Sequence, residues 1–383
     1  MDTADPVALT RALIRCPTVT PAAEPALDLL EERLTALGFT CRRLRFEGDG
    51  GSYPVDNLWA KLGSGHPHLA FAGHVDVVPT GAVEGWRNDP FAGEIVDGRI
   101  YGRGAADMKS GVASFVAAMA RLVAEGGPNR GAVSLLITGD EESEAVNGTV
   151  KLLAWAAAQG ERFDACLVGE PTCPERLGDT AKIGRRGSVS CRLTLRGRQG
   201  HTAYPHRADN AAHRLVAVLN HLIATPLDQG TDWFEPSNLQ VTSIDIGNPA
   251  ANVIPGEATA RFNIRFNDRH SRDSLDAWLR REIATLAPEF ELGVVGNAEA
   301  FVTAPGALSE LLSASVEAET GLRPKLSTTG GTSDARFFPA HCPVIEFGLV
   351  GTTMHQTDEN VAVADIEGLT RIYLRFVRQF LAA

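Results

Sequence analysis

The sequence predicts an α/β protein whose mainly parallel, mixed sheet is flanked by helices and interrupted by an inserted domain. In the first half of the chain, and again near its end, short apolar runs alternate with helical patterns, which indicates strands covered by helices. In the middle the pattern changes to β-α-β-β-α-β, the order of a small independent domain. The 383 residues suffice for two domains. We therefore expect one domain formed by residues 1–182 and 298–383, and an inserted domain at 183–297.

The first domain is expected to begin with a helix after Thr20. Thr20 can cap this helix, Pro21 fits its first turn, and Gly38 ends it. Its apolar stripe consists of Leu27, Leu30, Leu34 and Leu37. Further strands are expected at 68–78, 133–138, 165–168 and 344–347, and further helices at 107–125 and 151–159.

The inserted domain has its own sequence of elements. Alternating apolar and polar residues predict strands at 188–196, 239–246, 258–266 and 290–295. Helical patterns cover 210–224 and 271–284, with Asp209 and Ser271 as the expected caps.

Composition and charge exclude several classes of function. The net charge of −11 offers no basic surface for a nucleic acid or a lipid surface. No run approaches the roughly 18 apolar residues of a membrane span. The acidic N-terminus shows no signal-peptide pattern, and the six cysteines include no C-x-x-C pair. We therefore expect a cytoplasmic protein with reduced thiols.

Acidic and histidine residues recur where the predicted strands end. These residues are His74, Asp76, Glu141, Glu142, Glu170 and, after a loop, His355. Ligands of open α/β sheets bind outside the carboxyl ends of the strands, so this repetition predicts a binuclear metal site. Imidazole and carboxylate ligands suit zinc, with manganese or cobalt as competitors. Taken singly, each residue has a simpler interpretation; Asp107, for example, could cap the helix that follows it.

Several motifs carry a resemblance to a known family. They are Gly73-His-Val-Asp76, Gly102-Arg-Gly-Ala-Ala-Asp-Met-Lys109, Asp140-Glu-Glu142 and Val168-Gly-Glu-Pro-Thr172. These motifs resemble the aminoacylase/carboxypeptidase G class of di-zinc amide hydrolases. Longer motifs at 178–179, 182–188, 199–206, 252–255 and 330–336 are similar to bacterial members of this class that remove a succinyl group from a diamino acid.

The resemblance implies a division of roles among the acidic residues and histidines. Asp107 would bridge two Zn²⁺ ions, for which Co²⁺ or Mn²⁺ could substitute. His74 and Glu170 would complete one metal site, and Glu142 and His355 the other. Asp76 would fix the tautomer of His74, and Glu141 would be the general base. His201, from the inserted domain of a partner subunit, would donate a hydrogen bond to the oxyanion.

The resemblance also implies how the substrate and a second subunit are bound. Candidate contacts to a dianionic succinyl tail are Arg185, Ser188, Tyr204, Asn252, Arg265, Gly331, Thr332 and Ser333. The inserted domain would serve as a lid and as the interface of a homodimer. At two positions the chain departs from the family pattern, since Gly351 and Ala251 stand where asparagines are usual.

Three functions follow from these expectations. The first is hydrolysis of an N-succinyl diamino acid by a metal-activated water. The second is a related deacylase, such as one acting on N-acetylornithine. The third, from a different class, is a non-catalytic metal-binding interaction protein.

Overall fold

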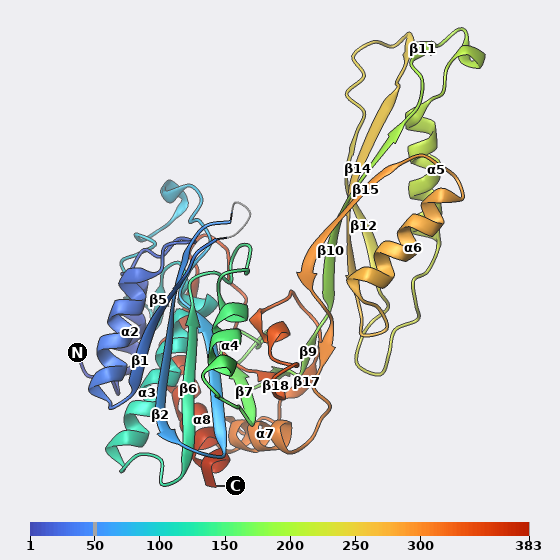
Figure 1. Ribbon diagram of the computed structural model, residues 1–383. Helices are drawn as coiled ribbons and strands as arrows, with labels where there is room; N and C mark the ends of the chain where they lie inside the picture. The colour runs from blue at the N-terminus through green and yellow to red at the C-terminus, as the bar shows by residue number, and fades with distance from the viewer. Residues whose placement is uncertain (49–51, 383) are drawn as a thin grey trace. The chain divides into compact units, whose positions relative to one another are not determined.

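The computed structural model describes residues 1–48 and 52–382, apart from the side chain of Asn297. The chain divides into two compact units (Figure 1). The first unit comprises Met1–Ile183, Thr303–Ser327 and Ser333–Ala383, and the second comprises Gly184–Val302 and Thr328–Thr332.

The first unit is built around a sheet of eight described strands. Their order is β1-β2-β6-β3-β7-β18-β8-β17. The strands are β1 (Thr40–Phe46), β2 (Val55–Ser64), β3 (His68–His74), β6 (Gly131–Thr138), β7 (Ala165–Val168), β8 (Thr180–Lys182), β17 (Lys325–Ser327) and β18 (Val344–Glu346). β3 runs parallel to β6 and β7, and β7 runs parallel to β18, whereas β1 and β2 are antiparallel. This confirms the predicted mainly parallel, mixed sheet.

Helices cover both faces of this sheet. They are α1 (Pro6–Ile14), α2 (Glu24–Ala36), α3 (Ser110–Ala124), α4 (Thr149–Ala158), α7 (Ala307–Thr320) and α8 (Val363–Ala382). On one face, Phe71 of β3 stacks on Phe115 of α3, with ring centroids 3.9 Å apart. Trp59 of β2 is in register with Leu136 of β6, which is in register with Ala72 of β3. Successive residues of a strand point to opposite faces, so Trp59 and Ala72 face away from the side that Phe71 occupies. On that opposite face Trp59 packs edge-on against Trp155 of α4 at 5.4 Å.

The Thr20 side chain does not cap a helix, which corrects the first predicted element. It donates instead to Asp76 Oδ2 at 2.8 Å, and α2 begins at Glu24 with Pro25 in its first turn. Tertiary contact with the end of β3 has replaced the local cap. An earlier helix, α1, was not foreseen, although Asp5 accepts hydrogen bonds from its first turn and Pro6 begins it.

The chain around Asp107 also differs from the expectation. Asp107 has extended backbone angles, φ −125° and ψ 100°, inside the wide turn Ala105–Lys109, and α3 begins only at Ser110. Asp107 is therefore not a helix cap, and its carboxylate remains available to the site. The strand predicted at 68–78 ends at His74, and beyond it only single contacts continue: Val75 N donates to Thr138 O at 3.0 Å, and Val77 forms an isolated bridge with Val19.

The remaining elements of the first unit are short. A small sheet pairs β19 (Asn360–Ala362), β5 (Arg99–Tyr101) and β4 (Glu94–Val96), and single turns of 3₁₀-helix occupy Val83–Gly85 and Asp334–Phe337. Among the described helices, none has the length and apolarity that crossing a membrane requires.

The second unit contains an antiparallel sheet in the order β12-β14-β10-β15. Its strands are β10 (Gly187–Arg196), β12 (Asn238–Asp245), β14 (Glu257–Phe266) and β15 (Glu291–Ala298), and its helices are α5 (Ala211–Ala224) and α6 (Arg272–Ala284). Alternate apolar residues of β10 and β14 form a core with both helices, for example Leu193, Phe262, Leu215 and Leu279. The β-α-β-β-α-β order is thus present.

Details at the edges of the second unit differ from the expected ones. Ser271 caps α6 as predicted, by accepting from Ser274 N at 3.2 Å. α5, however, is capped by Asn210 and not by Asp209. The unit extends beyond residue 297 because β16 (Phe301–Val302) pairs with β9 (Gly184–Arg185). A second small ribbon pairs β11 (Gly200–His201) with β13 (Val253–Ile254), followed by the 3₁₀ turn Pro205–Arg207.

Candidate metal centre

Three neighbouring parallel strands deliver candidate ligands to one edge of the first unit's sheet. His74 is the last residue of β3, Glu142 follows β6, and Glu170 follows β7. Because β3 lies between β6 and β7 and runs parallel to both, the three side chains emerge at the same edge. The turn before α3 adds Asp107, and the loop before β19 adds His355.

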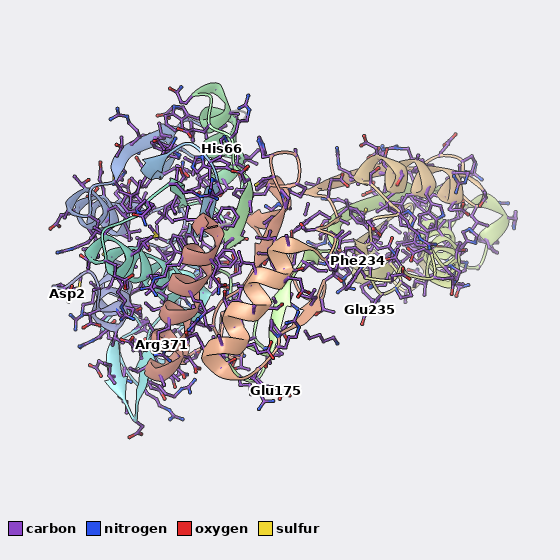
Figure 2. The ribbon with its side chains drawn as sticks, turned by 90° about the horizontal axis from the view of Figure 1, so that it is seen from below. Asp2, His66, Glu175, Phe234, Glu235 and Arg371 are labelled. Atoms are coloured by element: carbon purple, nitrogen blue, oxygen red, sulfur yellow. The ribbon has the colours of Figure 1, made fainter. Side chains whose placement is uncertain are left out.

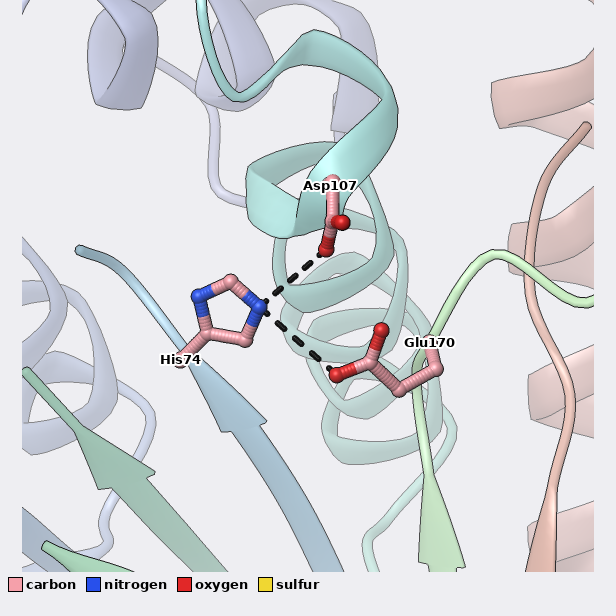
Figure 3. A group of neighbouring side chains, drawn as sticks. All are labelled: His74, Asp107 and Glu170. Carbon is pink, nitrogen blue, oxygen red and sulfur yellow. Dashed lines mark hydrogen bonds and ion pairs between the residues drawn. The ribbon is translucent and has the colours of Figure 1, made fainter. Parts of the chain in front are cut away.

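These residues form two groups that share Asp107. In the first, His74 Nε2 lies 3.2 Å from Asp107 Oδ1 and 3.6 Å from Glu170 Oε1 (Figure 3). In the second, His355 Nε2 lies 3.3 Å from Asp107 Oδ2 and 3.0 Å from Glu142 Oε1. Within each group the potential ligand atoms lie within 4.8 Å of one another. One oxygen of Asp107 thus faces each group, as a bridging carboxylate requires.

The chemistry of these side chains fits a divalent cation. His74 Nδ1 lies 2.9 Å from the main-chain oxygen of Asp76, which places its proton there and directs the Nε2 lone pair toward the carboxylates. Within residues 1–48 and 52–382, no lysine or arginine forms an ion pair with Asp107, Glu142 or Glu170. Three carboxylates therefore lie beside two imidazoles with no lysine or arginine side chain of the described chain to balance their charge.

Electrostatics around the site agree with this assignment. Burial, reinforced by the negative charges of Asp107 and Glu141, raises the pKa of Glu170 well above its usual range. Hydrogen bonds to Asp107 and Glu142 raise the pKa of His355 to about 10. The site thus gathers several carboxylates whose negative charges repel one another. A bound cation would stabilise this arrangement.

Asp76 contacts His74 through its main chain, and its carboxylate has other partners. Its carboxylate Oδ1 lies 3.6 Å from His74 Nδ1, so the main-chain oxygen, not the carboxylate, holds the ring. The carboxylate instead accepts from the backbone N–H groups of Glu141 at 3.3 Å and Glu142 at 3.2 Å. Asp76 therefore positions the segment after β6 as well as the histidine.

Glu141 lies beside the metal-binding groups and belongs to neither of them. Burial, together with the negative charges of Asp334, Glu142 and Asp107, raises its pKa well above the usual range. A carboxyl group whose protonated form is favoured in this way can accept a proton from water and return it to a leaving group. Its neighbour Asp140 was not singled out from the sequence, although its position at the end of β6 was a signal. Asp140 accepts from Tyr53 Oη at 2.8 Å and from three backbone N–H groups at 145–147, which fixes this loop.

One set of substrate candidates gathers at one end of the second unit. Arg185 Nη1 donates to Gly331 O at 3.1 Å, and Ser188 is in register with Arg265 on the neighbouring strand. Arg186 adds a third guanidinium, and burial together with its charge lowers the pKa of Arg265. A carboxylate near this cluster is Glu235, labelled in Figure 2, at 3.9 Å from Arg186. Thr332 belongs to the same unit, whereas Ser333 lies in the first unit, where it donates to Glu346 at 2.9 Å.

A second set lies at the opposite end of the same unit, at β11 (Figure 1). Thr202 N donates to Asn252 O at 3.0 Å, and Tyr204 N donates to His201 O at 2.8 Å. The N–H of Ala203 donates to His201 Nδ1 at 3.1 Å, so the neutral ring carries its proton on Nε2. The ten residues of β10, about 30 Å at 3.3 Å per residue, separate this set from the arginines.

Comparisons with known proteins agree with this architecture. The family model described as Peptidase family M20/M25/M40 matches residues 70–379. A succinyl-diaminopimelate desuccinylase of Rhodospirillum centenum is 58% identical over 378 residues, which cover 99% of this chain and 98% of the relative. Among solved structures, an M20 family metallo-carboxypeptidase from Sulfolobus solfataricus aligns with a TM-score of 0.81 at 15% identity, over 99% and 100% of the two chains. A dinuclear metal-binding M20 peptidase of Bacillus subtilis aligns with a TM-score of 0.71 at 14% identity, over 99% and 98%.

Proposed function

Because the chain belongs to the peptidase family M20/M25/M40, a family of metal-dependent amide hydrolases, we propose that it cleaves N-succinyl-LL-2,6-diaminopimelate. Hydrolysis of the amide gives succinate and LL-2,6-diaminopimelate, a step of amino-acid biosynthesis. The observation that carries this proposal is the identity of 58% to a succinyl-diaminopimelate desuccinylase over nearly the whole of both chains. The side-chain cluster at the sheet edge supports it independently of that identity.

The proposal includes two Zn²⁺ ions per subunit. His74, Asp107 and Glu170 would hold one, and Asp107, Glu142 and His355 the other, which the donor atoms and their separations support. When bound, zinc, or Co²⁺ or Mn²⁺ in its place, acts as a Lewis acid and lowers the pKa of water toward about 7.

Glu141 is the proposed general base. It accepts a proton from the attacking water as the new C–O bond forms, and it donates that proton to the amine nitrogen as the C–N bond breaks. Its raised pKa and its place outside both metal-binding groups support this role. Asp76 is the proposed positioning residue, since it holds the backbone of Glu141 and the ring of His74.

The succinyl carboxylate is proposed to bind at the arginine end of the second unit. Arg185 and Arg265 supply guanidinium donors there, and Ser188, Gly331 and Thr332 supply polar groups beside them. Ser333, the next residue in the chain after Thr332, is proposed to contribute as well.

His201 is proposed to donate its Nε2–H to the carbonyl oxygen on which negative charge develops, and Tyr204 and Asn252 to contact the substrate beside it. These residues and the arginines lie at opposite ends of one sheet, about 30 Å apart. One protomer's second unit therefore cannot bring both sets to a single substrate. We infer a homodimer in which His201 of the partner subunit serves each site.

The second unit offers surfaces for such a dimer. Among the described strands, β12 is an edge strand with a sheet neighbour on one side only, and Ile244 on that strand is 50% exposed. Val216 and Ile223 of α5 are likewise exposed. We also propose a cytoplasmic location, which the six free cysteines support.

A substrate panel on the purified protein tests the proposed function. N-succinyl-LL-2,6-diaminopimelate and N-acetylornithine are assayed side by side, with and without added Zn²⁺, and the Glu141→Ala variant with matched metal content serves as the control. We expect zinc-dependent release of succinate and little deacetylation. Preference for the acetylated substrate would indicate the related deacylase, and metal binding without turnover of either would indicate a non-catalytic protein.

A further inference from the structure

Glu359 lies at the end of the loop that carries His355, and it is fully buried although it belongs to neither metal-binding group. Its carboxylate faces the turn that carries Asp107, more than 250 residues earlier in the chain. Oε1 accepts from the N–H groups of Ala106 at 2.8 Å and Asp107 at 3.1 Å. Oε2 accepts from the N–H of Gly104 at 3.1 Å and from Arg103 Nη1 at 2.7 Å. These four donors saturate the carboxylate, which has about four acceptor positions.

The turn depends on this carboxylate because of its backbone conformation. Gly104 has a positive φ of 84°, and Asp107 is extended, so the segment departs from a regular helix just where its N–H groups need acceptors. Glu359 supplies an acceptor for three of them at once. The position of the Asp107 backbone, and with it the direction of its carboxylate, is therefore set by a side chain from a distant part of the sequence.

The same contacts tie the second histidine to this turn. Arg103 Nη1 also donates to the main-chain oxygen of Gln356, the neighbour of His355, at 3.1 Å. The N–H of Gly102 donates to the main-chain oxygen of Glu359 at 2.9 Å. His355 itself has a positive φ of 62°, a conformation that persists only where surrounding contacts hold it. The Arg103–Glu359 pair thus links the segments that carry Asp107 and His355.

We propose that Glu359 is a positioning residue that fixes the shared carboxylate Asp107 against His355, so that both metal positions are formed together. This inference rests on the proposed function for the identity of the metal. Because Asp107 belongs to both groups, a change at Glu359 should weaken both positions and not one. A role confined to holding the fold would lower stability and leave metal affinity unchanged.

The test uses the full-length Glu359→Gln variant and zinc titration against a competing chelator. The amide removes one acceptor oxygen and sets an NH₂ group against N–H donors, so the turn can no longer be held at every point. We expect the dissociation constants of both zinc positions to rise about 10–100-fold, as for other residues that orient metal ligands. The absorption spectrum of the Co²⁺-substituted protein should change as well, because it reports the ligand geometry directly.

A matched control is Glu319→Gln. Glu319 is a carboxylate on α7, remote in sequence from the ligands, that pairs with Arg375 at 2.7 Å and Arg371 at 3.2 Å. This variant should keep wild-type zinc affinity and Co²⁺ spectrum even if its melting temperature falls. Should Glu359→Gln not yield folded protein, Glu359→Asp replaces it. The shorter side chain keeps the charge but cannot reach all four donors, and the same rise in both zinc constants is expected.

The outcomes separate this inference from the proposed function. Wild-type zinc affinity at both positions in the Glu359 variant, with an active parent enzyme, overturns the inference and leaves the function standing. Weakened zinc binding in the variant of a parent that cleaves no succinyl substrate supports the inference and removes the function. Loss at one position only also overturns the inference, since Asp107 is shared.

Discussion

If His201 of one subunit acts in the site of the other, as proposed, the activity of a mixed dimer can be predicted quantitatively. One subunit carries His201→Ala, with its metal ligands intact, and the other carries Glu142→Ala, with its His201 intact. Each homodimer should be nearly inactive, because loss of one oxyanion donor costs about 10²–10³ in turnover and Glu142 is a proposed ligand of the second metal position.

The mixed dimer should regain activity because one of its two sites is complete. That site takes its ligands from the His201→Ala subunit and its donor from the Glu142→Ala subunit. Half of the wild-type activity per dimer is therefore expected once mixed dimers are isolated with two affinity tags. In an unfractionated equal mixture, where about half of the dimers are mixed, the value falls to about one quarter.

The reciprocal arrangement is the control. A subunit carrying both substitutions is paired with a wild-type subunit, and succinate release is measured in the same way. Donation from the partner leaves no complete site in this dimer, so activity should be about 100-fold lower or more. Donation within the same subunit predicts the reverse, with half activity here and none in the first dimer, and that result would refute the dimer argument.

Three further predictions concern the base, the metals and the stability of the first unit. Glu141→Ala should reduce turnover about 10²–10⁴-fold while elemental analysis finds unchanged metal content; a near-wild-type rate would show that another group takes the proton. Metal titration should give partial activity at low loading, because the buried group of His74, Asp107 and Glu170 should fill before the more exposed group. A strictly all-or-none rise in activity would contradict this order. Burial and the charge of Lys61 lower the pKa of His68 to about 4, so the unfolded chain binds more protons between pH 6.5 and 4 and stability falls as the pH drops through that window. Urea unfolding should show a loss of roughly 1–2 kcal/mol from pH 7 to pH 5 that His68→Gln abolishes, and an equal loss in the variant would assign it to other groups.

Local patterns predicted most helices and strands, because apolar periodicity and helix caps depend on residues that are close together in the sequence. The helix capped by Ser271 is an example, since its cap and its first turn lie within four residues. The Thr20 cap failed because Asp76, 56 residues away, offered its hydroxyl a better partner. The helix expected from residue 107 begins only at Ser110 for a similar reason, because Glu359, far away in the sequence, accepts the hydrogen bond from the N–H of Asp107.

Sequence patterns were enough to predict the class of fold, the second unit's order of elements and the acidic and histidine residues that gather at the sheet edge. It could do so because apolar periodicity and the placement of polar residues at strand ends are properties of short segments. The folded chain was needed to show which oxygen of Asp107 faces which histidine and which atoms of Asp76 contact the site. It was also needed to show that the arginines and His201 lie at opposite ends of one sheet. These features depend on contacts between residues far apart in the chain, whose geometry no local pattern encodes.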